Sequence, residues 1–348
     1  MPSKKLSLMT TQVHQNQRLD HLLAEWLPIA LRQSISKAKV RKLIVAGAVY
    51  LNGRRVRIAS KNLVPNARIE VYVDLHKLYS TDKDQDLDFV MTKSAILYED
   101  EYLIAINKPP GLPTQPTVDE ARENLFLAVK KFLAAREKVD LPKIYLGLHH
   151  RLDRDTSGVI LFTKRKEANP GIATEFSSHL AEKTYQALAI SDPSFCDGNC
   201  VKSWSVKNFL GRCSTSQLQK NSKKARFGSV RSGGDFAQTD FKLLGSKLFE
   251  NHKSIILIQA KPKTGRTHQI RVHLSEAGHP ILGDAFYGGP TEFAGEKIPR
   301  IMLHAVSLTF THPIHENKIT IRSLLPGDFA QCLKTFQIST IQGGGLDF

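Results

Sequence analysis

One segment of the sequence combines ionisable side chains with direct entry into an apolar run. It reads HHRLDRDTSG at residues 149–158 and leads into the run at 159–162. A polar loop attached to the start of a core strand holds its side chains rigidly, and catalytic groups are often found there. We expect Thr156, Ser157 and Gly158 to form the turn into the strand. A salt-bridged loop that caps a sheet has the same composition, so both interpretations stay open here.

Histidine and cysteine residues raise the question of a metal site. His149, His150 and Asp153 carry suitable ligand atoms, but adjacent histidines in an extended segment point to opposite faces and do not bind one ion together. The three cysteines within residues 196–213 lack a fourth ligand at the spacing of a zinc site. We therefore expect no metal.

A second segment, GRTHQIRVHL, begins at Gly265 and predicts a helix. Thr267 can cap this helix, which we expect to run to about Ala277, with Gly278 ending it.

Arg271 lies on that helix, at the border of the apolar face formed by Ile270 and Leu274. An arginine in this position can pair with a carboxylate from another segment, or it can remain solvated. A third segment, EKTYQA, opens a strand in which Lys183 and Tyr185 face the same side.

The chain that positions these segments has 348 residues, which is too long for one ordinary core, so we expect two domains. The smaller one shows the order helix, helix, hairpin. Leucine side chains at helical spacing mark the first helix, a serine caps the second, and a glycine ends it. An Asn-Gly pair between the short runs at 49–51 and 56–58 predicts the hairpin. The residues that set these boundaries are Pro28, at which the first helix ends, Ser34 or Ser36, Gly47, Asn52 and Gly53.

This small unit is rich in positive charge and resembles the S4 RNA-binding module. The segments RLDHLLAEWL, SKAKVRKLIVAGAVYLNG and ARIEVYV carry the likeness. The resemblance implies that its basic residues contact structured RNA, whereas a solvated basic face on an unrelated helical hairpin is the alternative. The expected RNA-binding residues are Arg32, Lys37, Lys39, Arg41, Lys42, Arg54 and Arg55.

The larger unit alternates β-rich runs with helical stretches. Examples of the runs are 95–98, 103–106, 159–162 and 254–258, and residues 319–321 add another strand. Irregular alternation predicts an α+β fold with a mixed, mainly antiparallel sheet. The expected division is a disordered arm at 1–16, an S4-like domain at 17–75, a linker at 76–93, a catalytic domain at 94–335 and a flexible tail at 336–348.

Overall composition points to a polyanionic partner. The net charge is +16 and the isoelectric point is near 9.6, which suits phosphate binding, although a merely basic surface would give the same values. The N-terminus is polar and no apolar run is long enough to span a membrane, so we expect a cytoplasmic monomer. No glycine-rich phosphate loop follows a strand, and no cofactor is expected.

Five ordered segments resemble the RluA family of pseudouridine synthases. They are ILYEDEYLIAINKPPGL, LHHRLDRDTSGVILFTK, EKTYQALA, GRTHQIRVHLSEAGHPILGDAFYGG and LHAVSLTFTHP. Two features depart from the family pattern. The double histidine places His149 where no function is expected, and the insert at 196–231 has no counterpart.

The resemblance implies a role for each matching residue. Asp153 would be the catalytic carboxylate, with Arg271 as its ion-pair partner. Tyr185 would pack on the flipped base and assist proton removal, while Ile270 would shape the apolar wall. Arg151 would fill the stack that the uridine leaves. The remaining substrate-binding residues would be His150, Lys183 and Arg266.

The implied reaction breaks the N1 glycosidic bond of uridine, rotates the base and rejoins it through C5. The carboxylate can attack the sugar or the base, or take a sugar proton. We expect large-subunit ribosomal RNA as the substrate, ahead of transfer RNA. Two rival functions are a catalytically idle RNA-binding or ribosome assembly factor of the same fold, and a metal-dependent nuclease that uses His149, His150, Asp153 and Asp155.

Overall fold

The computed structural model describes residues 4–45, 47–73, 89–116, 123–195, 202–213, 226–249 and 253–340. The chain divides into two compact units, a smaller one that comprises 1–88 and 116–123 and a larger one that comprises 89–115 and 124–348. Each unit has its own hydrophobic core.

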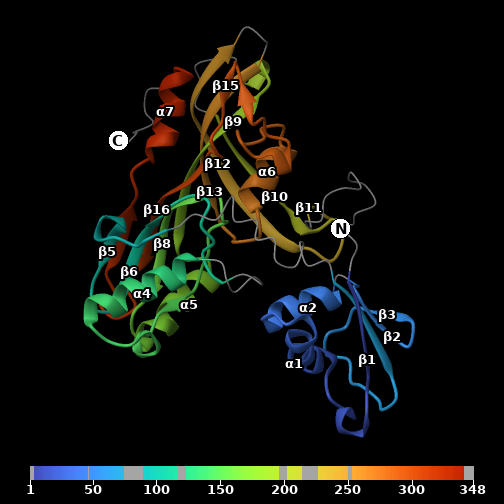
Figure 1. The fold of residues 1–348 in the computed structure, drawn as a ribbon. Coiled ribbons are helices and arrows are strands. Elements are labelled where there is room, and N and C mark those ends of the chain that lie inside the picture. Colours follow the sequence, from blue (N-terminus) through green and yellow to red (C-terminus); the bar gives the residue numbers. More distant parts are fainter. Residues whose placement is uncertain are drawn as a thin grey trace. The chain divides into compact units, whose positions relative to one another are not determined.

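In the smaller unit, two helices cover one face of a four-stranded antiparallel sheet (Figure 1). The strand order is β1-β4-β2-β3. Four leucines of the first helix, together with Val40 and Ile44 of the second, are buried against Val49, Ile69 and Val71 of the sheet. The elements are β1 (Lys4–Met9), α1 (Leu19–Leu31), α2 (Lys37–Val45), β2 (Val49–Leu51), β3 (Arg54–Val56) and β4 (Arg68–Val73).

The turn chemistry predicted for this unit is confirmed at Ser36, at Gly47 and at the Asn52-Gly53 pair. Ser36, rather than Ser34, caps α2, since its Oγ accepts a hydrogen bond from the Lys39 amide at 3.3 Å. Gly47 follows that helix with φ +78°. Asn52 and Gly53 have φ values of 49° and 76°, as a tight hairpin turn requires, although the second strand begins directly after them at Arg54 and ends at Val56.

The first helix does not end at Pro28. It continues to Leu31 and closes at Arg32, which has φ 53°. A proline in the last turn removes only one hydrogen-bond donor, and the following residues still pack on the core through Leu31. The expected end was therefore wrong by three residues.

The N-terminal arm is ordered from Lys4 onward, contrary to the prediction of a disordered segment. Strand β1 pairs with β4 along its whole length, and its Leu6 and Leu8 pack against the small core. Thr10 continues the attachment, because its Oγ1 donates to Val64 O at 2.7 Å and accepts from the Ala67 amide at 2.7 Å. Polar composition concealed this strand, since only two of its residues face the core.

The larger unit is built on one long sheet in the order β11-β10-β12-β13-β9-β16-β8-β6-β5 (Figure 1). Among these neighbours only β16 and β8 run parallel, so the predicted mixed, mainly antiparallel α+β fold is confirmed. The strands are β5 (Ile96–Glu99), β6 (Leu103–Lys108), β7 (Gly147–Leu148), β8 (Ser157–Thr163), β9 (Glu182–Ser191), β10 (Ser203–Arg212), β11 (Phe227–Ser229), β12 (Asp235–Phe249), β13 (Lys253–Pro262), β14 (Glu292–Phe293), β15 (Glu296–Lys297), β16 (Leu303–Thr311), β17 (Lys318–Arg322) and β18 (Ser339–Thr340). The helices are α4 (Leu125–Glu137), α5 (Asn169–Ser177), α6 (Gln269–Glu276) and α7 (Gly327–Thr335).

Strand β8 is buried on both faces, which explains its uninterrupted apolar sequence. Ile160 and Phe162 face the core that α4, α6 and α7 cover, whereas Val159 and Leu161 face a second core with α5 and β17. A strand held in this way gives the loop before it a fixed starting point.

Two expected boundaries of the catalytic domain were wrong. Phe89 and Met91, expected in the linker, belong to the large core, and Phe336, expected in the tail, packs there with 3% exposure. Strand β18 then pairs with β12. The rest of the expected linker from 76 to 88, the end of the tail from 341 to 348, and residues 1–3 of the arm lie outside the described residues.

Candidate active site

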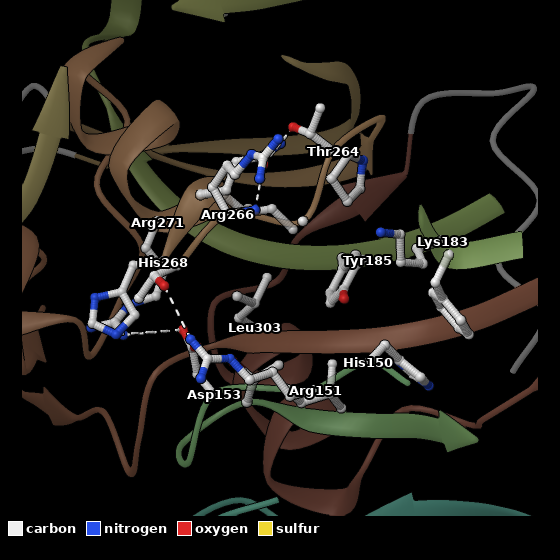
Figure 2. Close-up of a pocket in the computed structure, with 18 of the residues that line it drawn as sticks. His150, Arg151, Asp153, Lys183, Tyr185, Thr264, Arg266, His268, Arg271 and Leu303 are labelled. Carbon is white, nitrogen blue, oxygen red and sulfur yellow. Dashed lines mark hydrogen bonds and ion pairs between the residues drawn. The ribbon is translucent and has the colours of Figure 1, made fainter. Parts of the chain in front are cut away.

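A cavity of about 560 Å³ lies where the loop before β8, the start of β9 and the start of α6 meet (Figure 2). Segments that are far apart in the sequence therefore line one space. All eight side chains for which the sequence predicts a catalytic or substrate-binding role are among its lining residues. They are His150, Arg151, Asp153, Lys183, Tyr185, Arg266, Ile270 and Arg271.

Asp153 begins a tight turn that ends at the entrance of β8. The amide of Thr156 donates to Asp153 O at 3.2 Å and closes this turn. Ser157 and Gly158, expected in the turn, already belong to the strand. Gly158 has φ +114°, and a Cβ atom there would lie 2.2 Å from the carbonyl oxygen of Ala305 on β16. The glycine is thus required by close strand packing rather than by chain reversal.

Two buried side chains fix the backbone on either side of Asp153. Thr114 donates to Leu152 O at 2.7 Å and accepts from the Leu152 amide at 3.2 Å. Lys108, fully buried at the end of β6, donates to Arg154 O at 2.8 Å. Its ammonium group also donates to two carbonyls of the adjacent loop, and burial lowers the pKa of Lys108 to about 7. The loop before β8 is therefore anchored at both neighbours of Asp153.

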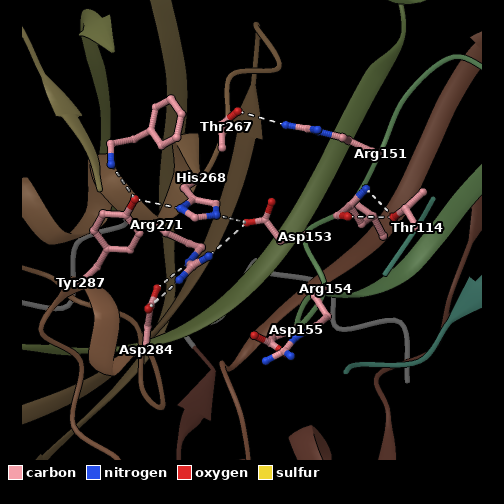
Figure 3. A network of polar contacts seen from close by, with 12 residues as sticks. Thr114, Arg151, Asp153, Arg154, Asp155, Thr267, His268, Arg271, Asp284 and Tyr287 are labelled. Atoms are coloured by element: carbon pink, nitrogen blue, oxygen red, sulfur yellow. Dashed lines mark hydrogen bonds and ion pairs between the residues drawn. The ribbon is translucent and has the colours of Figure 1, made fainter. Parts of the chain in front are cut away.

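Arg271 connects Asp153 to a second, buried carboxylate (Figure 3). Its Nε and Nη2 donate to Asp284 at 2.6 and 2.8 Å, and its Nη1 donates to Asp153 Oδ2 at 3.3 Å. Burial opposes the charge of Arg271, but the bonds to Asp284 outweigh burial and raise the pKa of the guanidinium. The arginine stays cationic beside Asp153. The predicted pair is present, with a partner that the sequence did not indicate.

Helix α6 begins after a strained turn rather than at a threonine cap. Thr267 makes no cap; its Oγ1 instead accepts a hydrogen bond from Arg151 at 3.1 Å. His268 precedes the helix with φ 56°. Gln269 holds this turn, because its Oε1 accepts from the Arg266 amide at 3.0 Å. The side chain of Gln269, rather than that of Thr267, therefore satisfies a backbone amide at the start of the helix. The helix ends at Glu276, two residues before Gly278.

Strand β9 supplies the predicted Lys183 and Tyr185 to the same side of the cavity (Figure 2). Tyr185 is 9% exposed, and burial together with the charge of Asp153 raises the pKa of its hydroxyl. Burial lowers the pKa of Lys183. Ile270 and Leu303 complete an apolar wall beside them.

The two adjacent histidines point to different partners, as predicted. His150 stacks on Phe176 with ring centroids 4.3 Å apart, and its Nε2 accepts from the Leu161 amide at 2.9 Å. His149 Nε2 lies 3.2 Å from Asn169 Oδ1. Since Nε2 of His150 is an acceptor, the ring is neutral, and burial lowers its pKa to about 3. The four residues proposed for a nuclease site thus do not converge on one point.

The side chains that line the cavity carry charges suited to a polyanionic ligand, and one of them is a carboxylate. Among its described lining residues, Asp153 is the single carboxylate, and it is accompanied by the cations Arg151, Lys183, Arg266 and Arg271. Such a charge distribution attracts phosphate groups to the rim and leaves one acid for chemistry.

Comparison with known proteins agrees with this geometry. Residues 102–276 match the family model for RNA pseudouridylate synthase, and residues 17–69 match the model for the S4 domain. The chain belongs to the RNA pseudouridylate synthase family. Members of this family isomerise uridine in RNA, so the protein is an isomerase with an S4 domain. The predicted family and enzyme class are confirmed.

Relatives of this synthase match almost its whole length. A protein named ribosomal large subunit pseudouridine synthase D from Haemophilus influenzae is 28% identical, with 98% of each chain covered. Ribosomal large subunit pseudouridine synthase C from Vibrio cholerae is 31% identical, with 91% of this chain and 92% of the relative covered. Human RNA pseudouridylate synthase domain containing 4 shares the fold, with a TM-score of 0.52 and 24% identity over 71% of this chain and 94% of that one. In the described part of the synthase, no helix is long and apolar enough to cross a membrane.

The basic residues predicted in the S4 domain lie on α2, the end of α1 and the hairpin. Arg32, Lys37 and Arg54 are exposed. Arg41 differs, because its Nε donates to the fully buried Asp20 at 2.8 Å. Lys39 is half-buried, Arg55 is exposed, and the side chain of Lys42 lies outside the described residues.

Several residues of the synthase site were not assigned from the sequence. Asp284 and His268 lie within the matching segment that begins GRTHQIR, and Lys108 lies within INKPPGL. The available signal was a charged residue at the end of an apolar run, which Lys108 and Asp284 both show. Cys196 and Cys200 of the insert lie outside the described residues, whereas its strand β11 lies beside α6.

Proposed function

We propose that this synthase isomerises uridine to pseudouridine in large-subunit ribosomal RNA, with Asp153 as its catalytic carboxylate. The supporting observation is the position of Asp153, the one acid among the cavity's described lining residues, 3.3 Å from Arg271. The names of the two bacterial relatives favour ribosomal RNA over transfer RNA.

The reaction conserves every atom of the nucleotide. The bond between sugar C1′ and base N1 breaks, a bond between C1′ and C5 forms, and the proton lost from C5 is balanced by the one gained at N1. Asp153 begins the exchange, either as a nucleophile or as the base that removes a sugar proton. It must be ionised in both cases, and the guanidinium of Arg271 stabilises that state.

The surrounding side chains receive the extruded base. Tyr185 and Ile270 offer a ring face and an apolar wall for a base that has left its stack, a step that costs a few kcal/mol. We assign the final proton removal from C5 to the Tyr185 side of the pocket. Arg151 lies at the mouth, and we propose that it replaces the base in the helix. Lys183 and Arg266 then meet the flanking phosphates, and His150 shapes the floor.

The S4 domain contributes affinity rather than chemistry. Arg54 and Arg55 on the hairpin and Lys37 and Lys39 on α2 present cations that can neutralise phosphates. Arg32 at the end of α1 extends this surface, and the predicted Lys42 belongs to the same helix as Lys37. We propose that this surface holds a structured RNA while Asp153 acts on one of its uridines.

Mapping pseudouridines in cells with and without the gene tests the substrate assignment. We expect one or more sites in large-subunit ribosomal RNA to disappear and to return when the wild-type gene is restored. Transfer RNA from the same cells is the control. Loss of sites only in transfer RNA would overturn the substrate, and loss of no site would favour the catalytically idle assembly factor.

A further inference from the structure

The geometry points to His268 as a positioning residue that, together with Arg271, fixes one oxygen of Asp153 and leaves the other oxygen to react. This inference rests on the proposed role of Asp153. His268 Nε2 lies 3.9 Å from Asp153 Oδ2, the oxygen that also receives Arg271 Nη1 at 3.3 Å (Figure 3). In the described part of the chain, no hydrogen bond or ion pair reaches Asp153 Oδ1.

The backbone at His268 is held in an uncommon conformation that directs the ring to this place. With φ 56° and ψ 20°, His268 adopts a left-handed geometry that is rare outside glycine. Gln269 maintains the strain, because its Nε2 donates to Gln238 O and Thr239 Oγ1, each at 2.9 Å. Strained backbone supported by neighbouring bonds is often found at functional positions.

Tyr287 determines which nitrogen of His268 carries the proton. The hydroxyl of Tyr287 lies 2.8 Å from His268 Nδ1 and accepts a hydrogen bond from the Phe227 amide at 3.3 Å. When the hydroxyl donates its own proton to Nδ1, the imidazole proton lies on Nε2, and the neighbouring carboxylate of Asp153 favours that arrangement. The opposite tautomer would place the Nε2 lone pair against the carboxylate of Asp153, which is electrostatically unfavourable.

Tyr287 is itself immobilised from several sides. It is 2% exposed, and the guanidinium carbons of Arg271 and Arg226 lie 4.9 and 5.3 Å from its ring centroid. Phe227 belongs to β11, so the segment at 196–231 supplies the last member of a series of contacts from Phe227 through Tyr287 and His268 to Asp153. The insert thus acts on the catalytic carboxylate through contacts that the sequence did not indicate.

The charges around His268 favour a neutral donor. Burial lowers its pKa, while the charge of Asp153 opposes that effect. A neutral Nε2–H donor can close from 3.9 Å to hydrogen-bond distance when substrate displaces water from the cavity. The ionisable groups that face the ring are Asp153, Arg271, Asp284, Arg151 and Tyr287.

Two substitutions at His268 distinguish loss of the hydrogen-bond donor to Asp153 from the effect of the strained backbone. Alanine and glutamine tolerate the left-handed backbone equally poorly, but the glutamine amide can still donate to Asp153. With an unmodified transcript of large-subunit ribosomal RNA, we expect His268→Ala to lower the single-turnover rate roughly 10- to 100-fold, as for a catalytic group misplaced by about 1 Å. RNA affinity should stay within about two-fold, since His268 is not among the phosphate-binding cations. His268→Gln should recover much of the rate.

Tyr287→Phe keeps the ring and removes the hydroxyl that sets the tautomer. We expect the single-turnover rate of this variant to fall roughly 3- to 10-fold while its RNA affinity stays unchanged. If His268→Ala does not fold, the rate of Tyr287→Phe tests the role of His268 instead. Wild-type rates in both His268→Ala and Tyr287→Phe, or a glutamine variant no faster than the alanine variant, would overturn the inference. Failure of the wild-type protein to form pseudouridine would instead overturn the proposed function.

Discussion

Asp284 holds Arg271 through two hydrogen bonds of 2.6 and 2.8 Å and so orients that guanidinium toward Asp153. Asp284 is 1% exposed and Arg271 is 7% exposed, so both charges depend on each other for compensation. The remaining guanidinium nitrogen, Nη1, donates a hydrogen bond to Asp153 Oδ2 at 3.3 Å. The buried Asp284–Arg271 ion pair thus supports the contact between Arg271 and the proposed catalytic carboxylate, Asp153.

Removing the charge of Asp284 should cost both stability and activity. We expect Asp284→Asn to lower the free energy of unfolding by about 3 kcal/mol, since one partner of a buried ion pair is left uncompensated. The rate of pseudouridine formation should fall as well, because Arg271 loses its orientation. Urea denaturation and tritium release from C5-labelled uridine measure the two effects.

Asp328→Asn is the matched control, because Asp328 binds Arg300 through similar bonds of 2.6 and 3.0 Å but lies outside the cavity lining. It should lower stability while leaving the rate near that of the wild type. Equal rates in the two variants would contradict the role of Asp284 in orienting Arg271.

A side chain at Gly158 should disrupt the junction of β8 and β16. The Cβ atom of Gly158→Ala would lie 2.2 Å from Ala305 O, and the residue would also have to keep φ +114°. We expect a loss of more than about 3 kcal/mol, from overpacking and backbone strain together. Thermal denaturation of the full chain provides the measurement.

Gly295→Ala is a control that distinguishes backbone strain from a steric clash. Gly295 has φ +79°, but no atom lies within 4 Å of the position that its Cβ would take. That control should lose only about 1 kcal/mol. If the two variants were equally stable, the close approach of β16 would not explain the glycine at position 158.

A buried histidine should make the protein sensitive to acid. His273 is fully buried between Thr239 Oγ1 at 2.9 Å and Asn208 Oδ1 at 2.8 Å, and burial lowers its pKa to about 4. Between about pH 6.5 and pH 4 the unfolded chain binds a proton that the folded chain does not, so stability falls as the pH falls. One such group contributes up to about 1.4 kcal/mol per pH unit.

His273→Gln keeps a donor and an acceptor but cannot titrate. Its stability should therefore fall less steeply than that of the wild type between pH 6.5 and pH 4, as urea denaturation at several pH values can show. Measurements at pH 8 provide the baseline difference between the two proteins. An unchanged slope would mean that His273 is protonated in the folded state.

Substitutions of Arg41 and Arg54 should have different effects, the first on the stability of the S4 domain and the second on RNA binding. Burial alone would raise the pKa of Asp20, but hydrogen bonds from Arg18 and Arg41 outweigh it and lower the pKa to about 2. Arg41→Ala should therefore destabilise the S4 domain by about 2 kcal/mol, the value of a hydrogen bond to a charged group. Arg54→Ala should leave stability unchanged and reduce the salt dependence of RNA binding by about one unit.

Fluorescence can follow the S4 domain alone, because the chain has two tryptophans and only Trp26 lies in that domain. A Trp204→Phe background leaves Trp26 as the reporter. Stability equal to the wild type in Arg41→Ala would show that Arg18 suffices for Asp20, and an unaltered salt slope in Arg54→Ala would contradict the RNA surface.

The residues that line the cavity could be picked out from the sequence because their segments are local and dense in ionisable side chains, while their roles stay predictions. Asp153, Tyr185 and Arg271 were identified through matching motifs, and the fold brings all three to one cavity. Asp284 could not be assigned in the same way. Its role depends on a loop returning beside α6, a tertiary relationship that periodicity does not encode.

Errors at the ends of elements have a common physical origin. Pro28 signals a helix end, yet core packing through Leu31 continues the helix beyond it. Thr267 has the right type for a cap, but Gln269 reaches the turn from within the helix. Core packing overruled the local propensity at Pro28, whereas at Thr267 the hydroxyl accepts from the distant Arg151 and a local glutamine bond holds the turn. Arg41 has a contact that the sequence did not indicate, since its guanidinium donates to the buried Asp20, and its predicted contact with RNA stays a prediction.

The catalytic role proposed for Asp153 is tested most directly by measuring pseudouridine formation by Asp153→Asn on a large-subunit ribosomal RNA transcript. Asparagine keeps the size of the side chain but removes the charge needed to begin the exchange. Asp155→Asn is the matched control, because Asp155 belongs to the same loop but pairs with Arg154 at 3.1 Å and is not among the cavity lining residues. We predict that Asp153→Asn binds the transcript like the wild type and forms no pseudouridine, while Asp155→Asn remains active. Turnover by Asp153→Asn at the wild-type rate would contradict the assignment.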